Sequence, residues 1–127
     1  MTIALIISAI LFSVIAGISK AICDLSEEGK LKFYKKTFWI KSLSWQNKWK
    51  NGDKKQGEKF FGSSRWFVPL TDAWHLFGFV FRSSYAKAYI CVGFLISVNI
   101  WYLFSVIGVY IIFATTFHIF HTYKILK

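Results

Sequence analysis

Acidic residues are few in this chain, and charge of either sign is missing from a long stretch near its end. The chain has 127 residues and only six Asp and Glu, all between Asp24 and Asp72, against 16 Lys and Arg. From Ala88 to Tyr123 it has no Asp, Glu, Lys or Arg. Apolar residues gather in that stretch and in Thr2–Ser19, with a charged region between the two. This distribution is typical of a membrane protein and argues against a soluble globular domain.

Cysteine is also scarce, and the familiar catalytic patterns are missing. Cys23 and Cys91 have no metal-binding spacing, so buried free thiols are favoured over a disulfide framework. Gly52 and Gly57 have the spacing of a phosphate loop, but Glu58–Lys59 follows where that loop needs Lys and then Ser or Thr. With no catalytic triad pattern and no paired carboxylates in an acid–base setting, the sequence does not name a reaction.

The first apolar stretch, Thr2–Ser19, is expected to cross the membrane. A secretory signal peptide is the alternative, but it would need a basic region first, and only Met1 and Thr2 precede the stretch. We therefore predict a retained first transmembrane helix within residues 1–22, ending near Lys20.

The charge-free stretch Ala88–Tyr123 is too long for one crossing. As a single helix it would measure about 54 Å, against a hydrocarbon core of about 30 Å. Nearly all cationic residues lie between Lys20 and Lys87, and the positive-inside rule places that segment in the cytoplasm. Lys124 and Lys127 return to the cytoplasm only if the stretch crosses twice. We therefore predict an all-α integral protein of the bacterial inner membrane with three transmembrane helices, the N-terminus outside and the C-terminus inside.

The last two spans are expected to form a transmembrane hairpin over residues 85–127. We place the second span at about Tyr85–Tyr102 and the third at about Phe104–Lys124. The turn is expected near Leu103–Ser105, with Asn99 as an earlier alternative. Five small residues would let these helices approach neighbours closely: Gly93, Ser97, Ser105, Gly108 and Ala114.

Residues 23–84 form a basic, aromatic-rich segment between the first and second spans. Its last part, about 71–82, is predicted to be an amphipathic helix at the cytoplasmic interface. Thr71 is the expected N-cap, with Asp72 in the first turn, where an acid favours the helix dipole. Ser83–Ser84 is expected to end this helix before the second span begins.

The aromatic and basic residues of this segment fit two kinds of partner. Rings interleaved with Lys stack on nucleic-acid bases, or they lie at headgroup depth with Lys reaching lipid phosphates. Because apolar spans tether the segment to a bilayer, we favour anionic membrane lipids over nucleic acid. A partner membrane subunit, a larger membrane complex or a homo-oligomer is a further expectation. The expected anchors are Trp39, Trp45, Trp49, Trp66 and Trp74, and the expected headgroup contacts are Lys48, Lys50, Lys54, Lys55 and Arg65.

The three histidines raise the question of a metal site. His118 and His121 are three residues apart and share a helix face, and Asp72 and His75 do the same. In the three-span topology both pairs reach the cytoplasmic membrane face, where four N and O ligands would suit Zn, Fe or Mn. Such a metal would activate water against a lipid-like interfacial substrate, so a membrane enzyme is the alternative function. We favour the simpler interpretation, in which the histidines are interfacial anchors and the protein is not an enzyme.

An oligomeric pore is a third hypothesis, because phage holins are also small and have two or three spans. The polar groups expected within the spans are Asn99, Ser97, Thr115 and Thr116, and no charge is expected deep in a span. Nothing in the sequence marks a pore specifically.

Four short runs of the central segment carry a further pattern. They are FWIKSLSWQNKWKNGD (38–53), GEKF (57–60), SS (63–64) and LTDAWHLF (70–77). Together they resemble a group of small bacterial and phage membrane proteins that has no assigned activity. The resemblance covers about the central third of the chain and implies no catalytic residues. It implies that the N-K-W-K-N-G-D and T-D-x-W-H elements belong together, which favours a shared structural or binding role.

Overall fold

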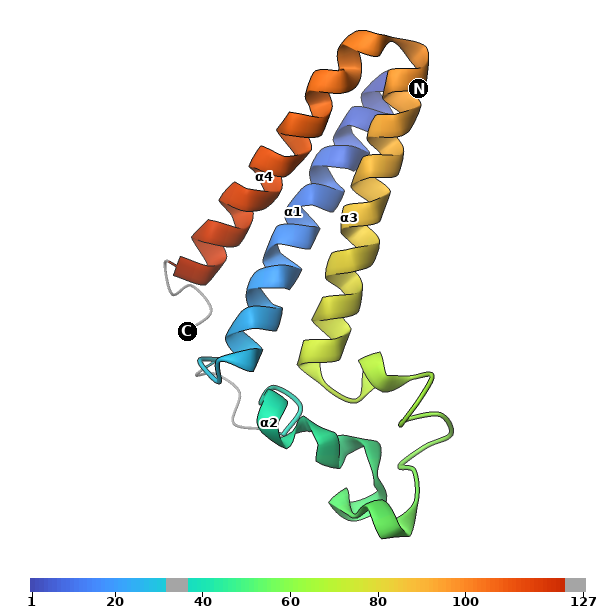
Figure 1. The fold of residues 1–127 in the computed structure, drawn as a ribbon, viewed down its shortest axis with the longest axis vertical. Helices are drawn as coiled ribbons and strands as arrows, with labels where there is room; N and C mark the ends of the chain where they lie inside the picture. The colour runs from blue at the N-terminus through green and yellow to red at the C-terminus, as the bar shows by residue number, and fades with distance from the viewer. Residues whose placement is uncertain (32–36, 123–127) are drawn as a thin grey trace.

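Three long helices form the body of the protein. The structure is a computed structural model that describes residues 1–31 and 37–122, and within these ranges it is helical with no β-strand. The helices are α1 (Thr2–Glu27), α3 (Ala73–Val98) and α4 (Phe104–Thr122). Figure 1 shows α1 between the other two, with α3 antiparallel to both. All three are long and apolar enough to cross a membrane, with the third candidate span running over Ile100–Thr122.

The segment between α1 and α3 lies beyond one end of this bundle, the end that α4 also reaches with its last turn (Figure 1). It contains one short α-helix and several single turns of 3₁₀-helix rather than a second domain core. In chain order these are α2 (Lys41–Ser44), η1 (Trp45–Lys48), η2 (Lys50–Gly52), η3 (Lys54–Gln56) and η4 (Val68–Leu70).

The close packing of the bundle comes from a face of small residues on α1. Four of its buried residues recur at intervals of four: Ala9, Ser13, Gly17 and Ala21. Small side chains at this spacing let membrane helices approach closely. At Gly17 a Cβ atom would lie 2.8 Å from Thr116 Cβ and 2.9 Å from the Phe113 carbonyl oxygen, so α4 packs directly on the α1 backbone.

Apolar side chains from all three helices pack around this face. Ala9, Ala88, Val92 and Val109 form the buried apolar cluster that joins the three helices. Towards the charged end of the bundle, the Phe113 ring of α4 stacks on Phe81 of α3 at a centroid distance of 5.7 Å. Aromatic side chains therefore bridge α3 and α4 where the two helices are farther apart.

Two of the five small residues expected to allow close packing, Gly93 and Gly108, do not contact a neighbouring helix within this chain. A Cβ atom at Gly93 or Gly108 would meet no atom within 4 Å. The reason is the helix order, because α1 lies between α3 and α4 and supplies the tightly packed face. The hairpin helices contact α1 more than they contact each other.

The amphipathic helix expected at 71–82 and the second span expected from Tyr85 are one continuous helix, α3. No break occurs at Ser83–Ser84, because Ser83 Oγ donates to the Val80 carbonyl oxygen at 3.2 Å and so satisfies its hydroxyl inside the helix. The N-cap is Asp72 rather than Thr71. Its backbone is extended (φ −157°, ψ 158°), and its carboxylate accepts a hydrogen bond from the His75 amide at 2.8 Å.

The turn between the last two spans lies at Asn99, the earlier of the two alternatives, and not at Leu103–Ser105. Asn99 has an extended backbone (φ −154°, ψ 125°), and its side-chain oxygen accepts from the Trp101 amide at 3.0 Å. It thus caps η5 (Ile100–Leu103), which continues into α4. The first helix is also longer than expected, since it runs to Glu27 rather than to residue 22.

Replacing Gly17 by Ala is expected to loosen the bundle. The new Cβ would lie 2.9 Å from a backbone oxygen of α4, so the free energy of unfolding should fall by about 1–3 kcal/mol, the usual cost of overpacking. Gly93→Ala and Gly108→Ala are matched controls, because they add a Cβ in open space and Ala is the better helix former. Unfolding in SDS followed by circular dichroism measures the difference. Equal stability of the Gly17→Ala and Gly108→Ala proteins would contradict the close contact.

Candidate functional site

The charged end of the bundle is joined to the central segment by the last turn of α1. Glu27 accepts from Lys41 Nζ at 2.5 Å with one carboxylate oxygen and from Trp74 Nε1 at 3.1 Å with the other. The Lys41 amine also lies 3.9 Å from the centroid of the Trp74 ring. Ser26 Oγ donates to the Trp39 carbonyl oxygen at 2.7 Å. These contacts fix α2 and the start of α3 against the end of α1.

A second set of hydrogen bonds orders the turns over residues 48–66. The Lys59 amide donates to the Lys48 carbonyl at 2.9 Å, and the Lys50 amide donates to the Gly57 carbonyl at 3.1 Å. The fully buried Ser63 donates its hydroxyl to the same Lys48 carbonyl at 2.7 Å. This segment is therefore a compact hydrogen-bonded unit, even though it has no sheet and only short helices.

The Glu58 carboxylate accepts the hydrogen bonds that order the turn at residues 58–64 of this unit. Its carboxylate accepts from the Gly62 amide at 2.9 Å, from the Ser64 amide at 3.1 Å and from the Ser64 hydroxyl. The Ser64 hydroxyl, followed by the Gly62 amide, lowers the pKa of the Glu58 carboxyl from its usual value. Gly62 adopts φ 75°, the left-handed conformation that glycine tolerates best.

The outer surface of the unit combines exposed rings with unpaired cations. Trp45, Phe61 and Trp66 are 50%, 86% and 79% exposed. Within residues 37–72, six cations have no ion pair with a carboxylate: Lys48, Lys50, Lys54, Lys55, Lys59 and Arg65. We call these three rings and six cations the basic aromatic surface.

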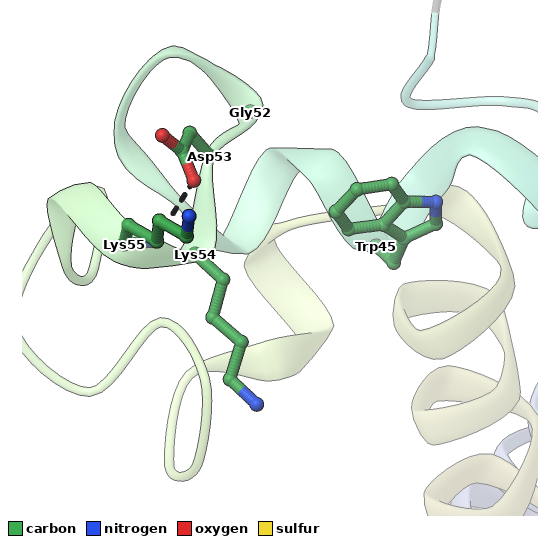
Figure 2. Close-up of a pocket in the computed structure, with 5 residues that line it drawn as sticks. All are labelled: Trp45, Gly52, Asp53, Lys54 and Lys55. Atoms are coloured by element: carbon green, nitrogen blue, oxygen red, sulfur yellow. Dashed lines mark hydrogen bonds between the residues drawn. The ribbon is translucent and has the colours of Figure 1, made fainter.

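Figure 2 shows one part of this surface, an open hollow of about 680 Å³ between Trp45 and the turn at residues 52–55. The Asp53 carboxylate accepts from the Lys55 amide at 2.9 Å, so the only acid in the hollow serves as a cap for η3. The Lys54 side chain extends away from that carboxylate in Figure 2. Positive charge therefore dominates the hollow.

Not all of the expected tryptophan anchors are on this surface. Trp39 is half-buried and stacks on Phe77 of α3 at a centroid distance of 5.9 Å. Trp74 is held in the junction with Glu27, and Trp49 is half-buried. Trp45 and Trp66 are the two expected anchors whose rings are largely exposed.

The four residues expected to bind a metal lie in two separate pairs. Asp72 is completely buried, and its Oδ2 lies 2.7 Å from His75 Nδ1. His121 Nε2 lies instead 3.3 Å from Glu28 Oε1 on α1, and His118 Nδ1 lies 3.2 Å from Thr122 Oγ1. In the part of the chain that the structure describes, no group of three or more His, Cys, Asp and Glu residues could hold a metal ion. The pairs stay apart because α1 lies between α3 and α4 (Figure 1).

Two members of the basic aromatic surface, Lys59 and Phe61, are absent from the residues expected from sequence. Both follow Glu58, whose hydrogen bonds to Gly62 and Ser64 turn the chain back on itself. An acid followed at four and six residues by Gly and Ser in a polar stretch is a weak signal for such a turn. It does not indicate by itself which neighbouring side chains face outward.

Comparisons with protein families, with characterised proteins and with solved structures find no match to this chain. The resemblance of the central segment to small bacterial and phage membrane proteins therefore stays a prediction. The functional argument depends on the geometry of the chain itself.

The turn around Glu58 is expected to open at acidic pH. Its carboxyl pKa is lower in the folded chain, so the stabilisation is complete above the unfolded pKa of about 4.3 and is lost as pH falls through the folded value. Hydrogen exchange of the full chain, corrected for intrinsic rates, should become faster over residues 60–66 in acid. Glu58→Gln should exchange fast at every pH, because a neutral amide is a weaker acceptor. Exchange that stays slow in strong acid in the wild type would contradict this role of Glu58.

Proposed function

We propose that this chain is a small three-span protein of the bacterial inner membrane whose basic aromatic surface binds the anionic headgroups of the cytoplasmic leaflet. One observation carries the proposal. At the end of the bundle, the central segment carries six cations without carboxylate partners and three exposed rings. Aromatic rings favour headgroup depth, and each Lys near an anionic surface contributes about 1 kcal/mol to binding.

The position of this surface relative to the spans supports the same conclusion. The apolar stretch of α1 ends at Lys20, which pairs with Asp24 at 2.5 Å, so the headgroup region is expected near these residues. Glu27 lies one turn further and holds Lys41 and Trp74. These contacts hold α2 and the start of α3 near the end of the apolar stretch, which supports a position of the central segment at the membrane surface.

The orientation follows from the positive-inside rule. Residues 37–72 and the last turn of α4 lie at one end of the bundle, and Met1 lies near the other end (Figure 1). Short cation-rich segments stay in the cytoplasm, so this end is proposed to face inward. A fluorescent protein fused after Lys127 should fluoresce in bacteria, and alkaline phosphatase fused there should be inactive. Active phosphatase at that position would contradict the orientation.

Lipid binding by the basic aromatic surface is tested on the full chain in vesicles by hydroxyl-radical footprinting. Trp66 should be oxidised less in vesicles that contain phosphatidylglycerol than in phosphatidylcholine alone, and high salt should remove the difference because it screens charge. Trp101 is a matched internal control, since it is 73% exposed against 79% for Trp66 and belongs to η5, which joins α3 to α4 at the opposite end of the bundle.

A variant separates the charge effect from simple contact with the bilayer. Replacing Lys48, Lys50, Lys54 and Lys55 by Gln should abolish the phosphatidylglycerol-dependent protection of Trp66 and leave Trp101 unchanged. Equal protection of Trp66 in neutral and anionic vesicles would count against the proposal, and so would protection that the four substitutions do not reduce.

A further inference from the structure

A small cavity lies beside the first turns of α3, apart from the basic aromatic surface. It has a volume of about 150 Å³ and is lined by Pro69, Trp74 and Phe79 as apolar walls and by Cys23, His75 and Arg82 as polar groups. This volume is well below the 300–1,000 Å³ of pockets that enclose a whole small molecule. It suits one compact chemical group, with the rest of the molecule outside.

The two basic side chains of the cavity are available to a ligand. Arg82 is exposed and forms no hydrogen bond or ion pair with any residue that the structure describes. His75 uses Nδ1 for the buried Asp72 carboxylate at 2.7 Å, which leaves Nε2 for another partner. The His75 ring and the Arg82 guanidinium line the same cavity. A guanidinium without a protein partner favours an anion with several oxygen atoms, which it can bind through two hydrogen bonds.

The packing of α3 on α1 sets the position of the cavity along the length of the bundle. A Cβ atom at Gly78 would lie 3.8 Å from Cys23 Sγ, and the Lys87 amine lies 5.5 Å from the centroid of the Phe12 ring. Arg82 is therefore level with the part of α1 between Phe12 and Cys23, near the end of the apolar stretch at Ser19. The end of the apolar stretch is where lipid phosphates are expected to meet the hydrocarbon core.

We propose that Arg82 and His75 bind the phosphate of one membrane phospholipid, with Pro69, Trp74 and Phe79 against its glycerol backbone and upper acyl chains. The apolar walls distinguish this ligand from free phosphate, because an inorganic ion gains nothing from them. The inference rests on the proposed function in taking the cytoplasmic leaflet as the source of the ligand. It adds a single, specific lipid site to a diffuse electrostatic surface.

Native mass spectrometry of the full-length protein, released from a non-ionic detergent, tests this site. The wild type should retain one phosphatidylglycerol at collision energies that remove all others, and diacylglycerol, which lacks the phosphate, should not be retained. Arg82→Gln should reduce the retained fraction at least about tenfold, as expected for the loss of a charge-assisted contact. Lys87→Gln is the matched control, because it removes one exposed positive charge of α3 outside the cavity.

Several outcomes would overturn the assignment. They are equal retention by Arg82→Gln, equal loss in Lys87→Gln, retention of diacylglycerol, and displacement of the lipid by equimolar inorganic phosphate. Arg82→Lys provides a further readout, since it keeps the charge and should retain more lipid than Arg82→Gln. The proposed function fails separately, through Trp66 footprinting, because neither Trp66 nor the four substituted lysines line this cavity.

Discussion

The direct packing of α4 on the backbone of α1 at Gly17 is the contact on which the rest of the structure depends. With no side chain at that position, Phe113 and Thr116 come within about 3 Å of where a Cβ would be. The Lys20 amine, one turn later, lies 5.8 Å from the centroid of the Phe117 ring. On its other side α1 meets α3 at Cys23 and Gly78. Because α1 is packed between α3 and α4, its last turn lies between these two helices at the charged end of the bundle.

This central position explains how a single turn of α1 can contact both the central segment and the start of α3. Ser26 binds the backbone of Trp39, and Glu27 binds both Lys41 and Trp74, so the same turn holds α2 and α3. A tethered basic tail would lose much of its freedom on binding a membrane, which weakens binding. Here residues 37–72 are ordered by contacts with the bundle and by the turn around Glu58. Folding therefore orders these residues, and under the proposed function the exposed rings and cations need little further ordering to bind headgroups.

Hydropathy and charge were enough to predict three apolar helices, with the central segment at the same end of the bundle as the end of the third helix. The turn at Asn99 was open as an alternative, because a capping Asn without Gly or Pro is an ambiguous signal. The break expected at Ser83–Ser84 was wrong, since a serine hydroxyl can bond within its own helix. The four expected metal ligands reach the same end of the bundle, but sequence spacing does not reveal that α1 stands between the two pairs. The turn around Glu58 depends on hydrogen bonds with Gly62 and Ser64, and no helical or strand periodicity in the sequence predicts them.

Because α3 is one continuous helix, its length determines where Arg82 and Lys87 lie relative to a bilayer. After Lys87, the charge-free remainder of α3 is Ala88–Val98, and these residues span about 16 Å, roughly half of a 30 Å hydrocarbon core. If α3 crosses the bilayer, the backbone of Lys87 lies within the hydrocarbon core. Its side chain must then extend back towards the headgroups. Helical side chains lean towards the helix N-terminus, which here is the charged end, so that direction is the favourable one. Arg82 is five residues, about 7 Å, closer to that end. Under the proposed orientation its guanidinium would reach the phosphates without an intramolecular partner, whereas the Lys87 amine lies 5.5 Å from the centroid of the Phe12 ring.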